Sequence, residues 1–175
     1  KLINALFHSS SGGMTENSED VWKNKYPYLS SVKDFDKKNP KFRWQKRFSN
    51  KQLTNLFPKI GGLKNIEILN ITSTGRVKNV KLFGANGSYQ MSGVDLRKRL
   101  GLNSNFVRFK FFEEESNKKF PIKKSLIVFG QGSGHGVGMS QWGAKYMASR
   151  GQKAERILKY FYKGVQIKPF RKDYL

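Results

Sequence analysis

The stretch that most constrains the fold of this chain is residues 130–144. It reads Gly-Gln-Gly-Ser-Gly-His-Gly-Val-Gly-Met-Ser-Gln-Trp-Gly-Ala, with glycine at every second position up to Gly138. The apolar run at residues 126–129 predicts a buried strand before it, and good helix formers follow it. A glycine loop between a strand and a helix brings backbone amides close to a ligand at the helix N-terminus. The alternative is a tight crossover around a buried His135, one of the two histidines in the chain.

Two other stretches carry distinctive residues. Residues 7–17 read Phe-His-Ser-Ser-Ser-Gly-Gly-Met-Thr-Glu-Asn and are followed by Val21-Trp22, and residues 96–104 read Leu-Arg-Lys-Arg-Leu-Gly-Leu-Asn-Ser. The short hydroxyls and small residues after His8 suit the hydroxyl and N-acetyl groups of sugars, which need many directional hydrogen bonds. The alternative is a turn whose hydroxyls only satisfy the local backbone.

Local patterns in the first half of the chain predict short elements of both kinds. Residues 2–7 are strand-like, and residues 15–22 predict a short helical turn. Ser49 followed by Gln52 is a capping box, which predicts a helix that Pro58 ends.

The second half predicts the remainder of the fold. Apolar positions between residues 66 and 91 alternate with turn residues and predict an antiparallel meander. Ser92 and Gly101 predict the start and end of a helix. Residues 106–112 are strand-like, residues 113–117 predict an acidic loop, and two helices are expected at residues 139–149 and 153–162. The expected fold class is therefore α+β, with a mainly antiparallel sheet, short helices and a C-terminal helical hairpin.

Together the distinctive stretches resemble the signatures of the SpoIID/LytB family, the group of stage II sporulation protein D and amidase enhancer. Residues 134–144 carry one signature, residues 7–17 with Val21-Trp22 a second, and residues 96–104 a third. They stand in the family's order and cover almost the whole chain. The resemblance implies a single SpoIID/LytB-like domain over residues 1–175 that lacks the N-terminal segment of the family.

The resemblance also implies a function. Peptidoglycan is the implied substrate class, and the implied location is the cell envelope, outside the cytoplasm. Some family members resemble lytic transglycosylases, which need a carboxylic acid at the bond between N-acetylmuramic acid and N-acetylglucosamine. The expected partners are glycan strands, with anionic wall polymers or a cell-wall amidase as further candidates. The alternative is a non-catalytic amidase enhancer or a glycan-binding module.

Candidate binding residues come from the first and last signatures. We expect His8 and His135 to face one cleft because both lie in loops flanked by glycine. The residues expected to bind substrate are His8, Ser9, Ser10, Ser11, Gly12, Gly13, Thr15, Glu16, Gly134, His135, Gly136, Ser140 and Gln141. Gln131 and Ser133 stand where family members usually have Arg and Trp, which removes a surface for stacking a sugar ring.

The catalytic acid is a separate question. The resemblance places the family's catalytic glutamate before the position that matches Lys1, so we assign no catalytic residue in this chain. Glu16 could act as a second carboxylate or cap a short helix, and we favour the cap. The other carboxylates are interpreted as helix-end or surface groups. We therefore expect the isolated chain not to cleave peptidoglycan.

Composition limits the other possibilities. Lys plus Arg number 34 against 12 Asp plus Glu, and the net charge of +22 attracts polyanions and anionic membranes unless it merely solvates the fold. A basic nucleic-acid-binding domain is a distant alternative, because RRM, KH and zinc-finger signatures are missing. The chain has no cysteine, so disulfides and thiolate sites are excluded. We expect no cofactor and no metal, although His8, His135 and Glu16 would hold a metal weakly if they converged.

Overall fold

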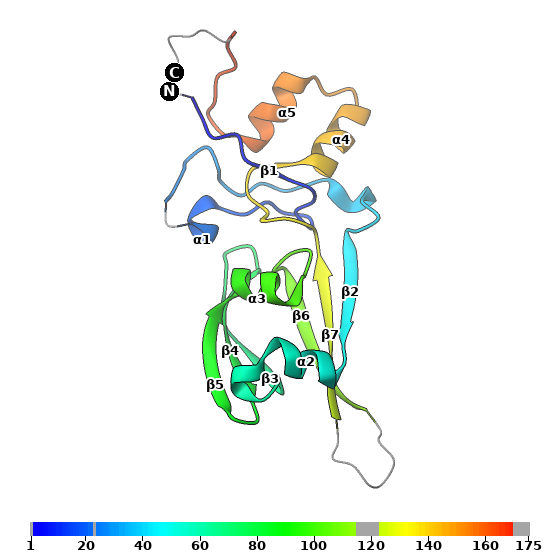
Figure 1. Ribbon diagram of the computed structural model, residues 1–175. Helices are drawn as coiled ribbons and strands as arrows, with labels where there is room; N and C mark the ends of the chain where they lie inside the picture. Colours follow the sequence, from blue (N-terminus) through cyan, green and yellow to red (C-terminus); the bar gives the residue numbers. More distant parts are fainter. Residues whose placement is uncertain (1, 23, 115–122, 170–175) are drawn as a thin grey trace. The chain divides into compact units, whose positions relative to one another are not determined.

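The protein divides into two compact units. The computed structural model describes residues 2–22, 24–114 and 123–169. The first unit comprises Lys1–Phe42 and Gly132–Leu175, and the second unit is Arg43–Gln131 (Figure 1). Within the described residues, four of the five strand pairings are antiparallel and short helices accompany them, so the predicted α+β class is confirmed.

One sheet of the second unit contains the predicted central strand. Strands β2 (Arg43–Phe48), β7 (Lys123–Gln131) and β6 (Val107–Glu114) pair antiparallel in that order, with β7 in the middle. The apolar run in β7 is buried on one side only, because successive side chains of a strand point to opposite faces. Leu126 and Val128 are therefore fully buried, whereas Phe129 is 42% exposed.

The other sheet of the second unit is the predicted meander. Strands β3 (Asn65–Ile71), β4 (Val77–Gly84) and β5 (Gly87–Ser92) pair antiparallel in chain order. The turns fall where glycine and polar residues interrupt the apolar alternation, and the register runs from Asn65 opposite Phe83 to Ile71 opposite Val77. Hairpin connections of this kind need only short loops, which is why a local pattern sufficed to predict them.

Two helices cover the apolar interior of the second unit. Helix α2 (Asn50–Leu56) begins at the predicted capping box: the Ser49 hydroxyl accepts from the Gln52 amide, and the Gln52 side chain accepts from the Ser49 amide. Such a cap contributes about 1 kcal/mol. Helix α3 (Gly93–Leu100) starts after Ser92 and ends at Gly101, as predicted. A 3-10 turn, η2 (Pro58–Ile60), follows α2.

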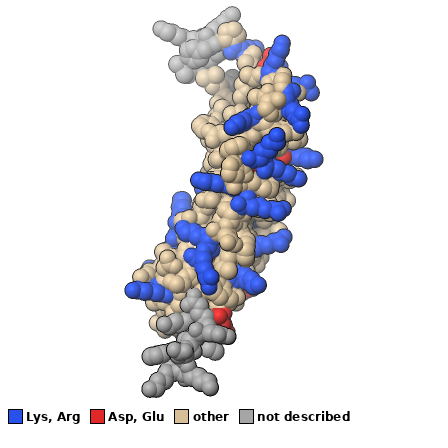
Figure 2. Space-filling model, turned by 90° about the vertical axis from the view of Figure 1, so that its right-hand side faces the viewer, with Lys and Arg blue, Asp and Glu red and all other residues tan. Residues whose placement is uncertain are grey.

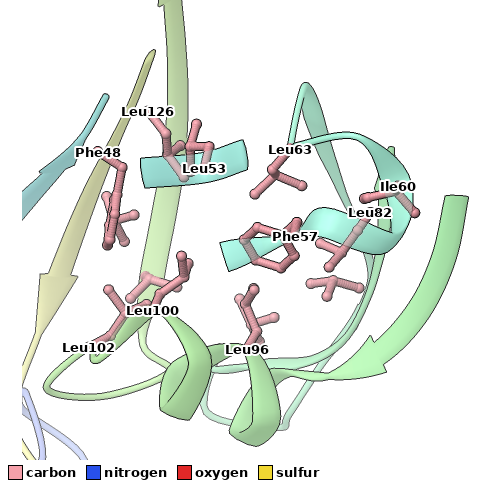
Figure 3. Close-up of a cluster of buried hydrophobic side chains, with 14 residues drawn as sticks. Phe48, Leu53, Phe57, Ile60, Leu63, Leu82, Leu96, Leu100, Leu102 and Leu126 are labelled. Carbon is pink, nitrogen blue, oxygen red and sulfur yellow. The ribbon is translucent and has the colours of Figure 1, made fainter. Parts of the chain in front are cut away.

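The core of the second unit lies between these helices and the strands. Figure 3 shows side chains of α2 and α3 pointing toward those of the strands and of the segment after η2. The buried side chains are Phe48, Leu53, Phe57, Ile60, Leu63, Val77, Val80, Leu82, Leu96, Leu100, Leu102, Val107, Leu126 and Val128.

The first unit is built from short elements and long loops. Its elements are β1 (Phe7–His8), α1 (Ser18–Val21), the 3-10 turn η1 (Asp36–Lys38), β8 (Met139–Ser140), α4 (Gln141–Ser149) and α5 (Ala154–Phe161). Helices α4 and α5 contact each other and form the predicted C-terminal hairpin (Figure 1). The core of this unit is Leu29, Val137, Met147, Ile157, Phe161 and Tyr162.

Two predictions of secondary structure need correction, and part of the second lies outside the described residues. The strand expected over residues 2–7 is reduced to β1, because its partner β8 is only two residues long and residues 2–6 have no paired strand. Glu113 and Glu114 extend β6, so they do not belong to a loop, and residues 115–117 of the predicted acidic loop lie outside the described residues. In the part of the chain that is described, no helix has the length and apolar character to cross a membrane.

Candidate functional site

The first and last signatures meet in the first unit through their backbones. Strands β1 and β8 pair in parallel, with Phe7 opposite Met139 and His8 opposite Ser140. Ser10 and Ser133 exchange both backbone hydrogen bonds, at 3.0 and 2.7 Å, and the Glu16 amide donates to the Gly136 carbonyl at 2.8 Å. These bonds fix the histidine–serine loop, residues 7–17, against the glycine loop, residues 130–138, along most of the length of the histidine–serine loop.

The two histidines lie side by side. Their ring centroids are 5.5 Å apart. The Val137 amide donates to Nδ1 of His135, so the proton of this ring is on Nε2, which donates to the Phe7 carbonyl. Nδ1 of His8 donates to the Val137 carbonyl at 3.1 Å. Each ring is thus oriented by a backbone carbonyl of the opposite loop, while the cleft that they were expected to face stays a prediction.

A third ring joins the pair and was not among the predicted site residues. The Trp22 ring lies 5.4 Å from that of His135, and its side chain is 39% exposed, whereas His8 is buried. Trp22 stands at the end of α1, five residues after Asn17. Its place in the first signature was the available sequence signal, but nothing local indicated that the turn of α1 would bring it to the glycine loop.

Beneath the histidine–serine loop lie two buried carboxylates, Asp34 and Asp36, which are 4% and 0% exposed. The Ser10 hydroxyl donates to Oδ2 of Asp36 at 2.5 Å, and the Gly12 amide donates to the same oxygen at 2.8 Å. The Ser11 hydroxyl donates to Asp34 at 2.5 Å. These contacts correct our interpretation of such carboxylates as surface or helix-end groups, and they direct two of the candidate hydroxyls into the protein.

Asp34 is also tied to the start of α4. Ser140 caps this helix by accepting from the Gly143 amide, and its hydroxyl donates to Asp34. Burial raises the pKa of Asp34 above its ordinary value of 3.8, and the neighbouring charge of Asp36 raises it further. Hydrogen bonds from Ser11, Ser140 and the Phe35 amide lower this pKa, but by less than burial and Asp36 increase it.

The remaining candidate residues differ in accessibility. Thr15 is buried, and its hydroxyl bonds to the backbone of Val32 in both directions. The buried positions are His8, Ser10, Ser11, Gly12, Thr15, Glu16, Gly136 and Ser140, the half-buried ones are Ser9, Gly13, Gly134 and His135, and Gln141 is exposed. Of the candidate residues, Gln141 is therefore exposed and His135 is half-buried, beside the exposed Trp22.

Glu16 does not cap helix α1. Asn17 occupies the N-cap position, and no side-chain hydrogen bond caps the helix there. Glu16 is instead fully buried, and its Oε1 accepts from the Asn17 amide at 3.1 Å. A carboxyl group in this position is enclosed by the loops that it supports.

A metal site at the histidines was the remaining alternative. Among the described residues, no group of three or more histidine, aspartate and glutamate side chains is placed to hold a metal ion. The two imidazoles are instead held by carbonyl and amide groups of the backbone. The arrangement of aromatic rings, backbone groups and a helix N-terminus is suited to binding a neutral polar ligand.

The raised pKa of Asp34 predicts how stability depends on pH. The folded state binds a proton at higher pH than the unfolded chain does, so ionised Asp34 destabilises the fold at neutral pH, and this penalty falls as the pH drops through the raised pKa toward 3.8. Relative to Asp34→Asn, the wild type should therefore gain stability on acidification from pH 7 to pH 4, by about 1.4 kcal/mol for each pKa unit of the raise. Denaturant unfolding of both proteins across this range measures the difference.

A second variant controls this experiment. Because the charge of Asp36 is one cause of the raise, Asp36→Asn should move the transition of Asp34 to lower pH. A difference between wild type and Asp34→Asn that stays constant with pH, or a wild type that loses stability relative to Asp34→Asn on acidification, would contradict the assignment.

Comparison with known proteins agrees with this description. The fold of the chain is of the α+β class. Residues 22–138 match the family described as a domain of unknown function (DUF8618), and the chain belongs to this family. The chain is similar to stage II sporulation protein D of Bacillus subtilis (strain 168), with 38% identity over 94% of the chain, and to that of Bacillus amyloliquefaciens, with 37% identity over 95%. It is also similar to an amidase enhancer of Bacillus subtilis (strain 168), with 29% identity over 95% of the chain.

These relatives confirm the resemblance to the SpoIID/LytB family that the signatures indicated. The chain spans 45% of the length of each sporulation protein and 30% of the amidase enhancer.

Proposed function

We propose that this chain is the glycan-holding part of a peptidoglycan-acting protein of the cell envelope, on the extracytoplasmic side. The observation that carries the proposal is the placement of Trp22 beside His135, at the junction of the two signature loops. An exposed aromatic face next to polar groups is a common way to hold a sugar ring, because the ring stacks on the apolar face while its hydroxyls reach the polar groups. Residues 1–175 form a single functional domain in this proposal.

The glycine loop lacks a stacking surface, because Ser133 stands where family members usually have Trp. In this proposal Trp22 supplies that surface. His135, which is half-buried, and Gln141, which is exposed, are the polar side chains that we propose for contacts with the sugar. The buried serines and carboxylates then act indirectly, by holding the histidine–serine loop in the conformation that presents the rings.

We propose further that these residues do not supply the acid for glycosidic cleavage. A general acid must lie within hydrogen-bond reach of the scissile oxygen, and such a group contributes about 10²–10⁴-fold in rate. In the first unit, Glu16, Asp34 and Asp36 are buried, and all three engage groups of the protein. The isolated chain should therefore bind glycan strands without cutting them.

Binding to peptidoglycan stripped of anionic polymers tests the holding role. Trp22→Ala should weaken binding about tenfold, or about 1.4 kcal/mol. Phe129→Ala is the matched control, since Phe129 is a comparably exposed aromatic in the second unit, 42% against 39% for Trp22. Equal affinities of wild type and Trp22→Ala, or an equal loss in the control, would refute the glycan site at Trp22.

Digestion of denuded and intact glycan strands tests the absence of cleavage. We expect no anhydro-muramic products on chromatography from the 175-residue chain. Such products from the wild type, lost in Glu16→Gln, would make Glu16 the acid and overturn this part of the proposal.

The similarity to an amidase enhancer supports a second candidate function. In that case the chain binds glycan, or the amidase itself, and raises the rate of a cell-wall amidase without cleaving anything. Adding the chain to an amidase digest of the same glycan distinguishes the two: a faster release of stem peptides that Trp22→Ala abolishes favours the enhancer.

A further inference from the structure

The hairpin of α4 and α5, together with Phe35, lines an open pocket that lies outside the signature loops. Its volume is about 500 Å³. The lining residues are Phe35, Tyr146, Met147, Arg150, Gln152, Arg156, Lys159, Tyr160 and Lys163. None of them belongs to the predicted glycan site, and all of them lie in the first unit. The pocket is thus a separate feature of this unit.

The charge of this pocket is strongly positive. Arg150, Arg156, Lys159 and Lys163 all line it. Two acidic groups lie nearby: Glu155 is exposed and pairs with Lys159 at 2.5 Å, and the pKa of Tyr160 is raised by burial and by the charge of the buried Asp34. The exposed Glu155–Lys159 pair contributes little to the electrostatic field. Arg150, Arg156 and Lys163 therefore dominate the positive field inside the pocket.

Aromatic rings contact two of the four lining cations, Arg150 and Lys163. The ring of Tyr146 is stacked on Phe35, with centroids 5.7 Å apart and an angle of 18°. Arg150 and Lys38 lie 5.5 and 5.9 Å from the same ring. Lys163 lies 5.0 Å from the centroid of Tyr160. The ring faces therefore already contact side chains of the protein, which favours a ligand recognised by its charge over one that stacks, such as a nucleobase.

A second pocket continues the first along the same hairpin. It measures about 510 Å³, shares Gln152, Arg156 and Lys159 with the first pocket, and adds Gly151, Lys153 and the carboxylate of Glu155. Lysine and arginine side chains are spread widely over the face shown in Figure 2, so net charge alone does not distinguish this place. What distinguishes it is two adjoining hollows that share Arg156 and Lys159, with Arg150 and Lys163 in the first and Lys153 in the second, which suits an anion that repeats along a chain.

We propose that the α4–α5 pockets bind a linear polyol-phosphate polymer, with successive phosphodiesters at Arg150 and at Arg156. Arginine forms paired hydrogen bonds with phosphate oxygens, and the polyol segments between the phosphates need no stacking surface. Such a contact would hold the protein on an anionic polymer through one site while the Trp22 site remains free for glycan. The proposal does not depend on the glycan-holding role.

The test uses synthetic poly(glycerol phosphate) as the probe and the full chain as the protein. The variant is Arg150→Gln/Arg156→Gln, and the matched control is Arg43→Gln/Arg108→Gln, which removes two exposed arginines from the second unit. We expect the pocket variant to bind at least about tenfold more weakly and to lower the slope of log affinity against log salt by about 2, one for each lost phosphate contact. The control should change affinity less than about threefold.

The outcomes separate the alternatives. An equal loss in both double variants would show that only net charge matters and would overturn the proposal. Tighter binding of a single-stranded DNA of the same charge, lost in the pocket variant, would also overturn it and assign the pocket to nucleic acid. Trp22→Ala should leave polymer binding unchanged, and Arg150→Gln/Arg156→Gln should leave binding to stripped glycan unchanged, so the failure of either site is visible independently of the other.

Discussion

Gly138→Ala should lower the free energy of unfolding by about 3 kcal/mol or more. Gly138 has φ of +75°, which costs a residue with a Cβ about 1–2 kcal/mol. A Cβ at this position would also lie far inside van der Waals contact with the Leu6 carbonyl oxygen, and relieving such overpacking costs about 1–3 kcal/mol. The Leu6 carbonyl belongs to the backbone and accepts from Met139, so it is not free to move aside.

Gly151→Ala is the matched control for this variant. Gly151 has nearly the same φ, +77°, but a Cβ there meets nothing within 4 Å. It should therefore cost only the conformational term, about 1–2 kcal/mol. Urea unfolding of both variants gives the comparison, and equal losses would mean that the close approach of the glycine loop to Leu6 contributes nothing.

Asp36→Ala should be comparably destabilising, whereas Asp36→Asn should stay within about 1 kcal/mol of the wild type. Alanine leaves the Ser10 hydroxyl and the Gly12 amide buried without their acceptor, and each unsatisfied donor costs about 1–3 kcal/mol. Both donors bond to Oδ2, whereas Oδ1 has no hydrogen-bond partner among the described residues. An asparagine with its oxygen in the Oδ2 position therefore keeps both bonds.

The measurement is urea unfolding, together with hydrogen exchange at the Gly12 amide. Faster exchange in Asp36→Ala than in Asp36→Asn would locate the loss in the histidine–serine loop. If asparagine proved as damaging as alanine, the negative charge of Asp36 would be what holds the loop, and a neutral oxygen in the Oδ2 position would not suffice as the acceptor.

Several elements were predictable because their causes are local in sequence. The capping box at Ser49, the turn residues of the meander and the glycine at the end of α3 act on neighbours within a few residues. The glycine at Gly151 between two helical patterns likewise predicted the hairpin of α4 and α5. The signatures added the family and the prediction of a cleft shared by His8 and His135, whose rings lie 5.5 Å apart.

The tertiary structure decided what these local causes leave open. Asp34 and Asp36 became buried acceptors for serines that lie 23 and 26 residues away, and no local pattern encodes that distance. The reach of the first strand was set by the length of β8, a partner more than 130 residues later in the chain, and the approach of Trp22 to His135 by the packing of α1. The sequence by itself therefore determined the elements and the family, because propensities and motifs act over short spans. Burial and the assembly of the site came from contacts between distant segments, which only folding brings together.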